Sequence, residues 1–178
     1  MPERVKSRYP LALADLVADQ LVEALTPGCQ RIAVGGSVRR RRPDVGDIEI
    51  VLVPITRPEL DLWGNTVRVR DDTDRILADL MLSDILSSRG AWGPLNKFLL
   101  HLPTGIPVDI FTATTANWGR DLMIRTGSAA WNIKVMSRLQ RLGYRGHAYG
   151  PHAVTGPDNR GLFAPDEESM FSLLGWAY

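Results

Sequence analysis

The chain has 178 residues, a formal net charge of +1 and an apolar fraction of 44%. This composition is typical of a globular protein with one core or two small ones, and it excludes a strongly basic chain, since the positive charge is only locally clustered. The one cysteine, Cys29, excludes a disulfide within the chain. The N-terminal stretch is charged and no apolar run approaches the ~18 residues of a membrane span. We therefore expect a cytoplasmic protein with no membrane partner.

Turn residues divide the chain into short periodic segments. In chain order, the patterns predict a helix (11–25), a short buried strand (31–34), a short helix (38–41), a strand (47–53), a helix (73–88), a hairpin (97–102 and 106–112) and helices after Asn117. The stretch 57–72 is the least regular, and a strand over 66–69 is one interpretation of it. Pro27-Gly28 is expected to end the first helix, Ser37 to cap the second, and the acidic residues 71, 72 and 74 to cap the third.

Two carboxylates lie close together in the predicted strand DIEIVLV, at Asp47 and Glu49. Residues i and i+2 of a strand point to the same face, so both carboxylates project side by side. Adjacent carboxylates repel each other unless a cation lies between them, and hard cations such as Mg2+ prefer oxygen ligands together with substrate phosphates. The pair is therefore either a metal site or the polar face of an edge strand.

A glycine-serine turn and a run of arginines precede this strand. Gly36 and Ser37 offer backbone N–H groups and a hydroxyl, and a helix that begins there points its N-terminus at an anion. Arg39 and Arg40 carry forked, permanently charged donors suited to phosphate oxygens, although the run 39–42 is equally consistent with a solvated loop. Each feature alone favours the ordinary structural interpretation. Their order and spacing together predict nucleotide chemistry.

A third carboxylate, Asp109, stands between Val108 and Ile110 in the second strand of the predicted hairpin. Charged residues are rarely left unpaired in such apolar surroundings. One interpretation is an arginine partner. The other is a third metal ligand, because three carboxylates on adjacent strands can hold two cations bridged by a phosphoryl group.

Three segments together resemble the family X DNA polymerases of the nucleotidyltransferase superfamily. GGSVRR followed by GDIEIVL is similar to the Gly-Ser turn and paired carboxylates of the superfamily. Thr126-Gly127-Ser128 with Asn132 is similar to the segment that links palm and thumb in family X, and DEESMFSLLGWAY is similar to its closing helix. The resemblance covers roughly residues 10–178. It implies a minimal member, close in size to small viral ones, without the N-terminal lyase domain or the helix-hairpin-helix motifs of larger relatives.

The resemblance implies an α+β fold with a nucleotidyltransferase palm over residues 1–116, built as a mixed sheet with helices on one face. A small α/β thumb that binds nucleotide and duplex would follow over residues 117–178. The implied activity is that of a monomeric DNA-directed DNA polymerase, which transfers a nucleotide from a dNTP to a primer 3′-OH by two-metal phosphoryl transfer. Its partner would be primer-template or gapped DNA, its role short-gap filling in DNA repair, and its cofactor two Mg2+ ions, with Mn2+ accepted.

The same resemblance assigns roles to individual residues. The catalytic residues and metal ligands would be Asp47, Glu49 and Asp109. The incoming nucleotide would be bound by Gly36, Ser37, Arg40, Gly127, Ser128 and Asn132. The phosphates of the DNA duplex would be contacted by Lys134, Arg138 and Arg141. An exposed basic helix face accounts for these three residues equally well.

Departures from the family pattern bear on fidelity and on the choice of function. Glu49 stands where aspartate is usual, Pro107 where an arginine near the primer terminus is common, and Ile124-Arg125 where an aromatic pair screens the ribose. These departures predict a low-fidelity enzyme that tolerates ribonucleotides. One alternative is a template-independent nucleotidyltransferase acting on a nucleic-acid end or another hydroxyl acceptor, which would need no duplex-binding thumb. A non-catalytic nucleic-acid binder is a third, and it would gain nothing from three carboxylates facing phosphates.

Overall fold

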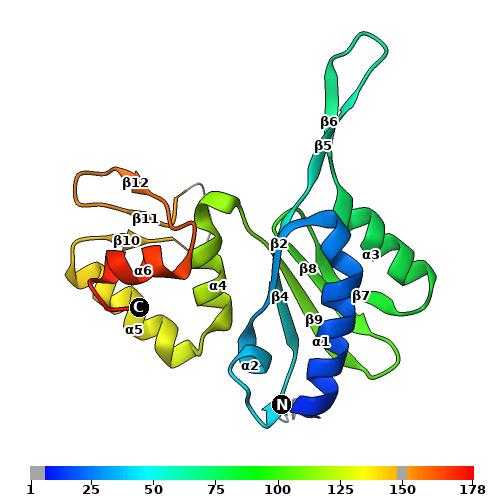
Figure 1. Cartoon of the computed structure of the whole chain (residues 1–178), viewed down its shortest axis with the longest axis horizontal. Coiled ribbons are helices and arrows are strands. Elements are labelled where there is room, and N and C mark those ends of the chain that lie inside the picture. Colours follow the sequence, from blue (N-terminus) through cyan, green and yellow to red (C-terminus); the bar gives the residue numbers. More distant parts are fainter. Residues whose placement is uncertain (1–6, 148–151) are drawn as a thin grey trace, which may run out of the picture.

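The computed structural model describes residues 7–147 and 152–178. They form two neighbouring halves, a sheet half and a helical half (Figure 1). The sheet half contains a five-stranded sheet in which β4 and β9 are parallel and the other neighbours antiparallel. In spatial order its strands are β2 (Cys29–Val34), β4 (Ile48–Pro54), β9 (Ile106–Thr112), β8 (Asn96–His101) and β7 (Leu86–Trp92).

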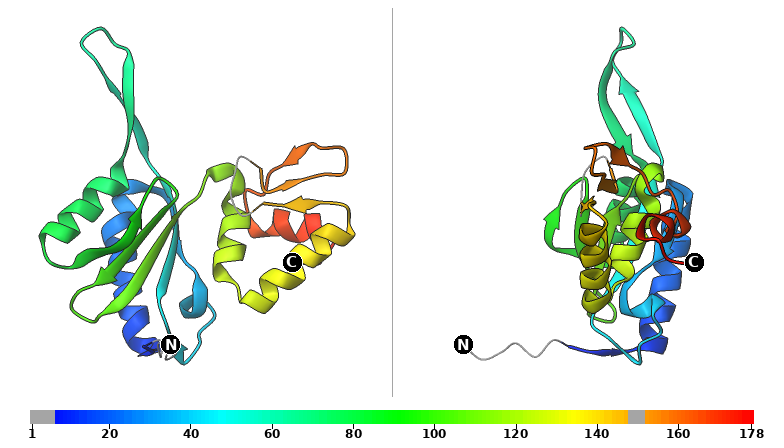
Figure 2. Two further views of the ribbon diagram at one scale, coloured as in Figure 1. Left: turned by 180° about the vertical axis from the view of Figure 1, so that it is seen from behind. Right: turned by 90° about the vertical axis from the view of Figure 1, so that its left-hand side faces the viewer.

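Alternation along β4 gives the sheet one face covered by α1 (Leu11–Leu25) and α3 (Asp72–Leu82) and a second face that is open around Glu49, while Val51 and Val53 of that second face are buried. Ile48, Ile50 and Leu52 are fully buried in the core that β4 forms with α1 and α3. Glu49 alternates with these residues and is half-buried on the opposite face of the strand. The ribbon views show α1 and α3 on one side of the sheet (Figure 2). The predicted helix over 11–25 and the predicted hairpin, now β8 and β9, are confirmed.

The helical half contains α4 (Trp118–Thr126), α5 (Ala129–Arg141) and α6 (Glu167–Leu174), preceded by the 3-10 helix η2 (Thr115–Asn117). A small sheet of β10 (Arg145–Gly146), β11 (Val154–Thr155) and β12 (Gly161–Leu162) completes it. This half has its own hydrophobic cluster, which includes Val135, Leu139 and Met170. Trp118 and Leu122, however, share a separate cluster with Val51 and Val53 of β4. The division into domains at residues 116 and 117 stays a prediction.

Short elements complete the sheet half. β1 (Tyr9–Pro10) pairs antiparallel with β3 (Asp44–Val45), and η1 (Thr26–Gly28) ends α1 at the predicted Pro-Gly. The helix α2 (Gly36–Arg39) lies below the lower end of β4 (Figure 1). Across the two described ranges, no helix combines the length and the apolar character that a membrane crossing requires.

Two predicted elements differ from the structure. The helix expected over 73–88 ends at Leu82, because Asp84 takes a positive φ of 55° and Leu86 then pairs with His101 as the first residue of β7. The strand expected to be buried over 31–34 is instead the edge strand β2, with Arg31 exposed. The position of a segment in the sheet determines both the end of α3 and the exposure of β2, and the spacing of apolar residues along the chain does not indicate that position.

A projecting hairpin of β5 (Thr56–Leu60) and β6 (Thr66–Asp71) stands out from the body (Figure 1). The strand read over 66–69 is present, but its partner β5 was not predicted, because Pro58 and two charged residues conceal the pattern. Leu62 and Trp63 at the tip are 96% and 83% exposed. At the other end of the hairpin, Asp71 caps α3 by accepting from the Thr73 N–H, as predicted.

Candidate active site

Glu49 and Asp109 are direct neighbours on the open face of the sheet. The parallel register of β4 and β9 pairs these two residues, and Asp47 precedes β4 by one residue. All three carboxylates are half-buried. The sheet therefore brings together the two strands whose carboxylates were predicted to act jointly.

Burial and mutual repulsion act on these carboxylates. Burial first, and then the charge of Asp47, raise the pKa of Glu49 to about 7, against the opposing charge of Arg125. Burial also raises the pKa of Asp109, against the opposing charge and hydrogen bond of Arg89. A cation bound between these carboxylates would offset the burial and repulsion that raise their pKa values.

Gly36 packs directly against the Glu49 carboxylate. Its φ is +59°, and a Cβ added there would overlap Glu49 Oε2 and lie 3.0 Å from Cδ. The Gly35 N–H donates to the Glu49 carbonyl at 2.7 Å. The glycine turn and the second carboxylate are thus one structural unit, and only glycine fits the contact at position 36 without strain.

Ser37 does not cap a helix, contrary to the prediction. The helix α2 begins at Gly36 with Gly35 as its N-cap, and no side chain caps it. The reason is that the Gly35 carbonyl already accepts from the Arg39 N–H at 3.1 Å, so the helical turn begins two residues earlier than expected. Ser37 is half-buried within the turn.

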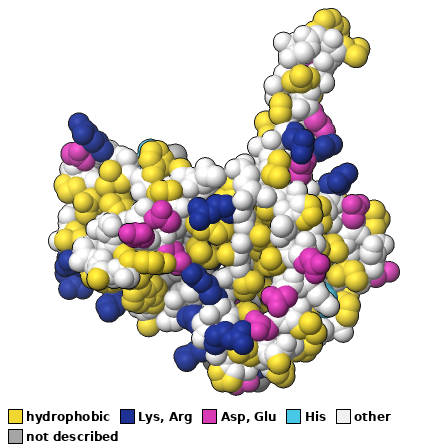
Figure 3. Space-filling view, in the orientation of Figure 1, with side chains coloured by type: hydrophobic (Ala, Val, Ile, Leu, Met, Phe, Trp, Pro, Cys, Tyr) yellow, Lys and Arg dark blue, Asp and Glu magenta, His cyan; other side chains and the backbone are white. Residues whose placement is uncertain are grey.

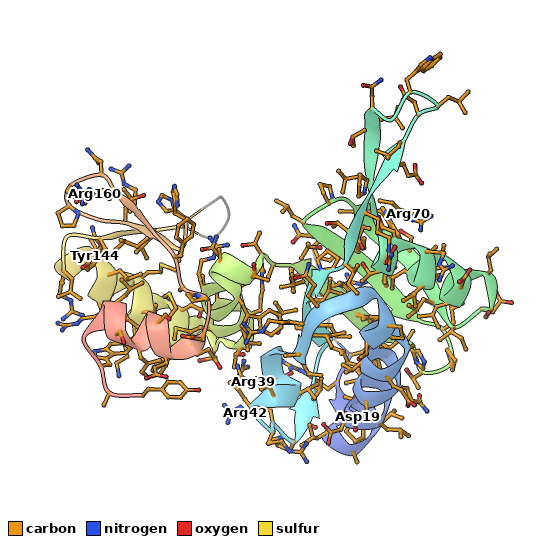
Figure 4. All side chains as sticks on the ribbon, turned by 45° about the horizontal axis from the view of Figure 1, so that its top comes forward. Asp19, Arg39, Arg42, Arg70, Tyr144 and Arg160 are labelled. Atoms are coloured by element: carbon orange, nitrogen blue, oxygen red, sulfur yellow. The ribbon has the colours of Figure 1, made fainter. Side chains whose placement is uncertain are left out.

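Arg39 and Arg40 connect the sheet half to the helical half. Arg40 Nη1 donates to the Thr126 carbonyl, and Arg39 Nη1 donates to Thr126 Oγ1 at 2.7 Å. Arg39 also forms a two-point ion pair with Glu167 at 2.8 and 2.6 Å, and it lies between the two halves (Figure 4). Basic side chains run along the same junction (Figure 3). Arg40, the predicted phosphate ligand, therefore lies beside the segment 126–132, which was predicted to bind the incoming nucleotide.

The segment from Gly127 to Asn132 forms the opposite wall of the junction. Ser128 caps α5 through its hydroxyl, which accepts from the Trp131 N–H at 3.4 Å. Asn132 Nδ2 donates to the Ile124 carbonyl at 2.8 Å, while Asn132 Oδ1 is buried without a hydrogen-bond partner among the described residues. Asn132 is thus tied to the last turn of α4, and its contact with a base stays a prediction.

The predicted duplex contacts have different neighbours. Arg138 Nε donates to the Leu174 carbonyl at 2.9 Å and so ties α5 to the end of α6. Lys134 lies over Trp131 and Trp176, with its Nζ 5.6 and 5.2 Å from the ring centroids. Arg141 bonds only within its own helix turn, to the Ser137 carbonyl, in the contacts the structure shows. Their role toward DNA stays a prediction.

Three residues of this region were not predicted from the sequence. Arg89 of β7 pairs with Asp109, Arg125 of α4 lies 3.7 Å above the Phe111 ring, and Glu167 pairs with Arg39. The arginine partner considered for Asp109 is thus present. Among residues 7–147 and 152–178, no three His, Cys, Asp or Glu side chains are oriented closely enough to share one ion.

Comparisons with known proteins identify the fold. No protein-family profile and no curated protein matches the sequence. The structure, in contrast, is similar to the crystal structure of polymerase beta from Leishmania infantum in a ternary P/T complex, with a TM-score of 0.73 and 19% sequence identity over 98% of this chain and 75% of that one. The chain has the polymerase β fold. The predicted α+β class and the resemblance to family X are confirmed at that level.

The likeness to the polymerase β fold includes both halves of the described structure. Its sheet carries the carboxylates on β4 and β9, and its helical half faces them across the junction that Arg39 and Arg40 span. The likeness covers nearly the whole chain, so both halves belong to one shared architecture.

Proposed function

We propose that the chain is a DNA-directed DNA polymerase that transfers a nucleotide from a dNTP to a primer 3′-OH. The observation that carries this proposal is the pairing of Glu49 with Asp109 on adjacent parallel strands, next to the glycine turn and opposite a helix N-terminus capped by Ser128. The polymerase β fold supports it, since the similar structure from Leishmania infantum is a ternary P/T complex.

The residues of the junction would bind and orient the nucleotide. Backbone N–H groups of the turn at Gly36 and Ser37 would meet the phosphates, together with the Arg40 guanidinium, which would leave the Thr126 carbonyl to do so. Gly127 and Ser128 would pass beside the sugar, and Asn132 would contact the base. Positioning of this kind supplies most of the rate gain in phosphoryl transfer.

The donor set on the open face fits a pair of hard divalent cations. Asp47, Glu49 and Asp109 offer only carboxylate oxygens, the ligands that Mg2+ and Mn2+ prefer, and their mutual repulsion shows in the raised pKa of Glu49. When bound, two such ions would lower the pKa of the primer hydroxyl and stabilise the leaving pyrophosphate. The carboxylates themselves would fix the acceptor end against the nucleotide.

We further propose short-gap filling in DNA repair with low fidelity. The position of Arg125 supports this: it stacks on Phe111 at 3.7 Å, where family members have an aromatic residue that screens the ribose. A guanidinium in that place presents polar N–H groups where an aromatic ring would present an apolar edge to the 2′ position. The enzyme would then accept ribonucleotides at rates close to those of deoxynucleotides.

Extension of a one-nucleotide gapped duplex tests the proposal. The full chain is incubated with labelled gapped DNA, Mg2+ or Mn2+ and each of the four dNTPs in turn. We expect insertion opposite the template base, reduced at least ~10³-fold by Asp109→Ala. Arg160→Gln, which removes an exposed charge far from the carboxylates (Figure 4), serves as the matched control and should retain activity.

Single-stranded DNA separates the main alternative. A template-independent nucleotidyltransferase would extend the single strand as fast as the gapped duplex and would choose nucleotides without regard to the template. Equal rates on both substrates would therefore replace the polymerase proposal by that alternative. No extension of either substrate, with Arg160→Gln and the parent chain both folded by circular dichroism, would contradict both.

A further inference from the structure

Arg89 occupies a β-bulge at the edge of the sheet. The pairing of β7 with β8 is regular up to Ser88 and resumes at Trp92, so Arg89 falls in the irregular stretch between them. A bulge re-aims side chains that regular pairing would point elsewhere, and bulges are frequent beside active sites. Here the bulge directs Arg89 over the open face, across β8 and toward β9.

Three contacts hold the Arg89 guanidinium on that face. Its Nε donates to the Leu99 carbonyl at 3.0 Å, and its Cζ lies 5.5 Å above the Phe98 ring centroid. Its Nη2 donates to Asp109 Oδ1. The two anchors on β8 place a permanent cation beside Asp109, so the ion pair does not depend on a freely moving surface side chain.

The neighbouring carboxylates would attract a divalent metal ion, which would compete with the Arg89 guanidinium for Asp109. Asp47 and Glu49 face the same region, and the charge of Asp47 acts on Asp109 while Arg125 opposes it. A divalent ion shared by these carboxylates would compete with Arg89 for the negative charge of Asp109, whose Oδ1 accepts from Arg89 Nη2. The Arg89 side chain is 37% exposed, so it can leave Asp109 without opening the core.

We propose that Arg89 is a positioning residue that holds the Asp109 carboxylate on the open face and competes with a divalent cation for it. The inference rests on the proposed function for the identity of the site. It makes cation entry at Asp109 harder than at Asp47 and Glu49. Arg89 thereby keeps the third carboxylate neutralised until a more strongly charged ion arrives.

Direct Mn2+ binding tests the competition without any turnover. Titration of the full chain with Mn2+ at low ionic strength, followed by the electron paramagnetic resonance signal of the free ion, gives the dissociation constant. We expect Arg89→Gln to bind Mn2+ about three- to ten-fold more tightly than the parent chain. Arg89→Lys keeps the charge and should restore most of the parent affinity. Arg57→Gln, which removes a more exposed arginine paired with Asp72, is the charge-matched control.

The Asp109→Asn background shows whether the effect passes through Asp109. The gain from Arg89→Gln should vanish there, because no carboxylate remains to be released. Unchanged or weaker Mn2+ binding by Arg89→Gln would overturn the inference, as would an equal gain in Arg57→Gln or in the Asp109→Asn background. Because binding is read without DNA or nucleotide, inactivity in gap filling with the Mn2+ result intact would overturn only the proposed polymerase function.

Discussion

On the face of β4 and β9 that α1 covers, Ile48, Ile50 and Val108 are fully buried, whereas Glu49 and Asp109, one residue further along each strand, are half-buried carboxylates on the open face. The same two strands therefore carry the core on one side and the charged site on the other. Because side chains alternate strictly, a substitution on one face need not disturb the other. Stability and activity should be separable residue by residue.

The largest expected effect is on the open face. Asp47→Asn should lower the gap-filling rate by about 10³-fold, because the proposed metal site would lose one of its three carboxylates. The free energy of unfolding of the Asp47→Asn variant should differ from that of the parent by less than about 1 kcal/mol, because Asp47 is half-buried and repelled by neighbouring carboxylates. Single-turnover extension and urea denaturation measure the two quantities. A stability loss as large as the activity loss would show that the two faces are not independent.

The mirror experiment is on the covered face. Ile50→Ala should lower the free energy of unfolding by about 2–5 kcal/mol, through lost burial and the cavity left behind. Extension by the folded protein should stay within about three-fold of the parent rate. Leu62→Ala at the exposed hairpin tip is the control and should be neutral in urea denaturation. A large fall in the rate of folded Ile50→Ala would contradict the separation.

Lys97 is an exception among the apolar residues of the covered face, because its charged side chain is only 1% exposed. Its Nζ lies 3.1 Å from Asp74 Oδ1 and 3.9 Å from Asp71 Oδ2, at the N-terminus of α3. Lys97→Met should lower the free energy of unfolding by about 1–3 kcal/mol, even though methionine fills similar space, because two carboxylates lose their cation. In the Asp74→Asn background the loss should shrink. Urea midpoints equal to the parent value would show that the ion pair adds nothing.

The last expected effect is a pH dependence of stability from the open face. The pKa of Glu49 is about 7 in the folded chain against 4.5 for the free group, so the folded state holds the proton more tightly. Stability from this residue is therefore greatest at low pH and falls as the pH rises from about 4.5 to about 7, by at most ~1.4 kcal/mol per pH unit. Glu49→Gln should be less pH-dependent than the parent in metal-free urea denaturation. Identical slopes for both proteins would contradict the assignment.

Much of the site was predictable because its determinants are local. The alternation in DIEIVLV places Asp47 and Glu49 on one face, and the apolar run around Asp109 marks a carboxylate that needs a partner. The glycine at position 36 signals a tight turn, although its contact with the Glu49 carboxylate becomes visible only in the folded chain. Helical spacing likewise determined α1 with its observed bounds.

Tertiary structure alone decided which charges meet. Arg89 reaches Asp109 from 20 residues away through a bulge, and Arg39 meets Glu167 from 128 residues away. The early end of α3 and the edge position of β2 likewise follow from strand pairing. The physical reason is that spacing along a chain reports the face on which a side chain lies. Which charged side chain becomes its neighbour on that face depends on the order and register of the strands, and these are determined by many contacts between residues far apart in the sequence.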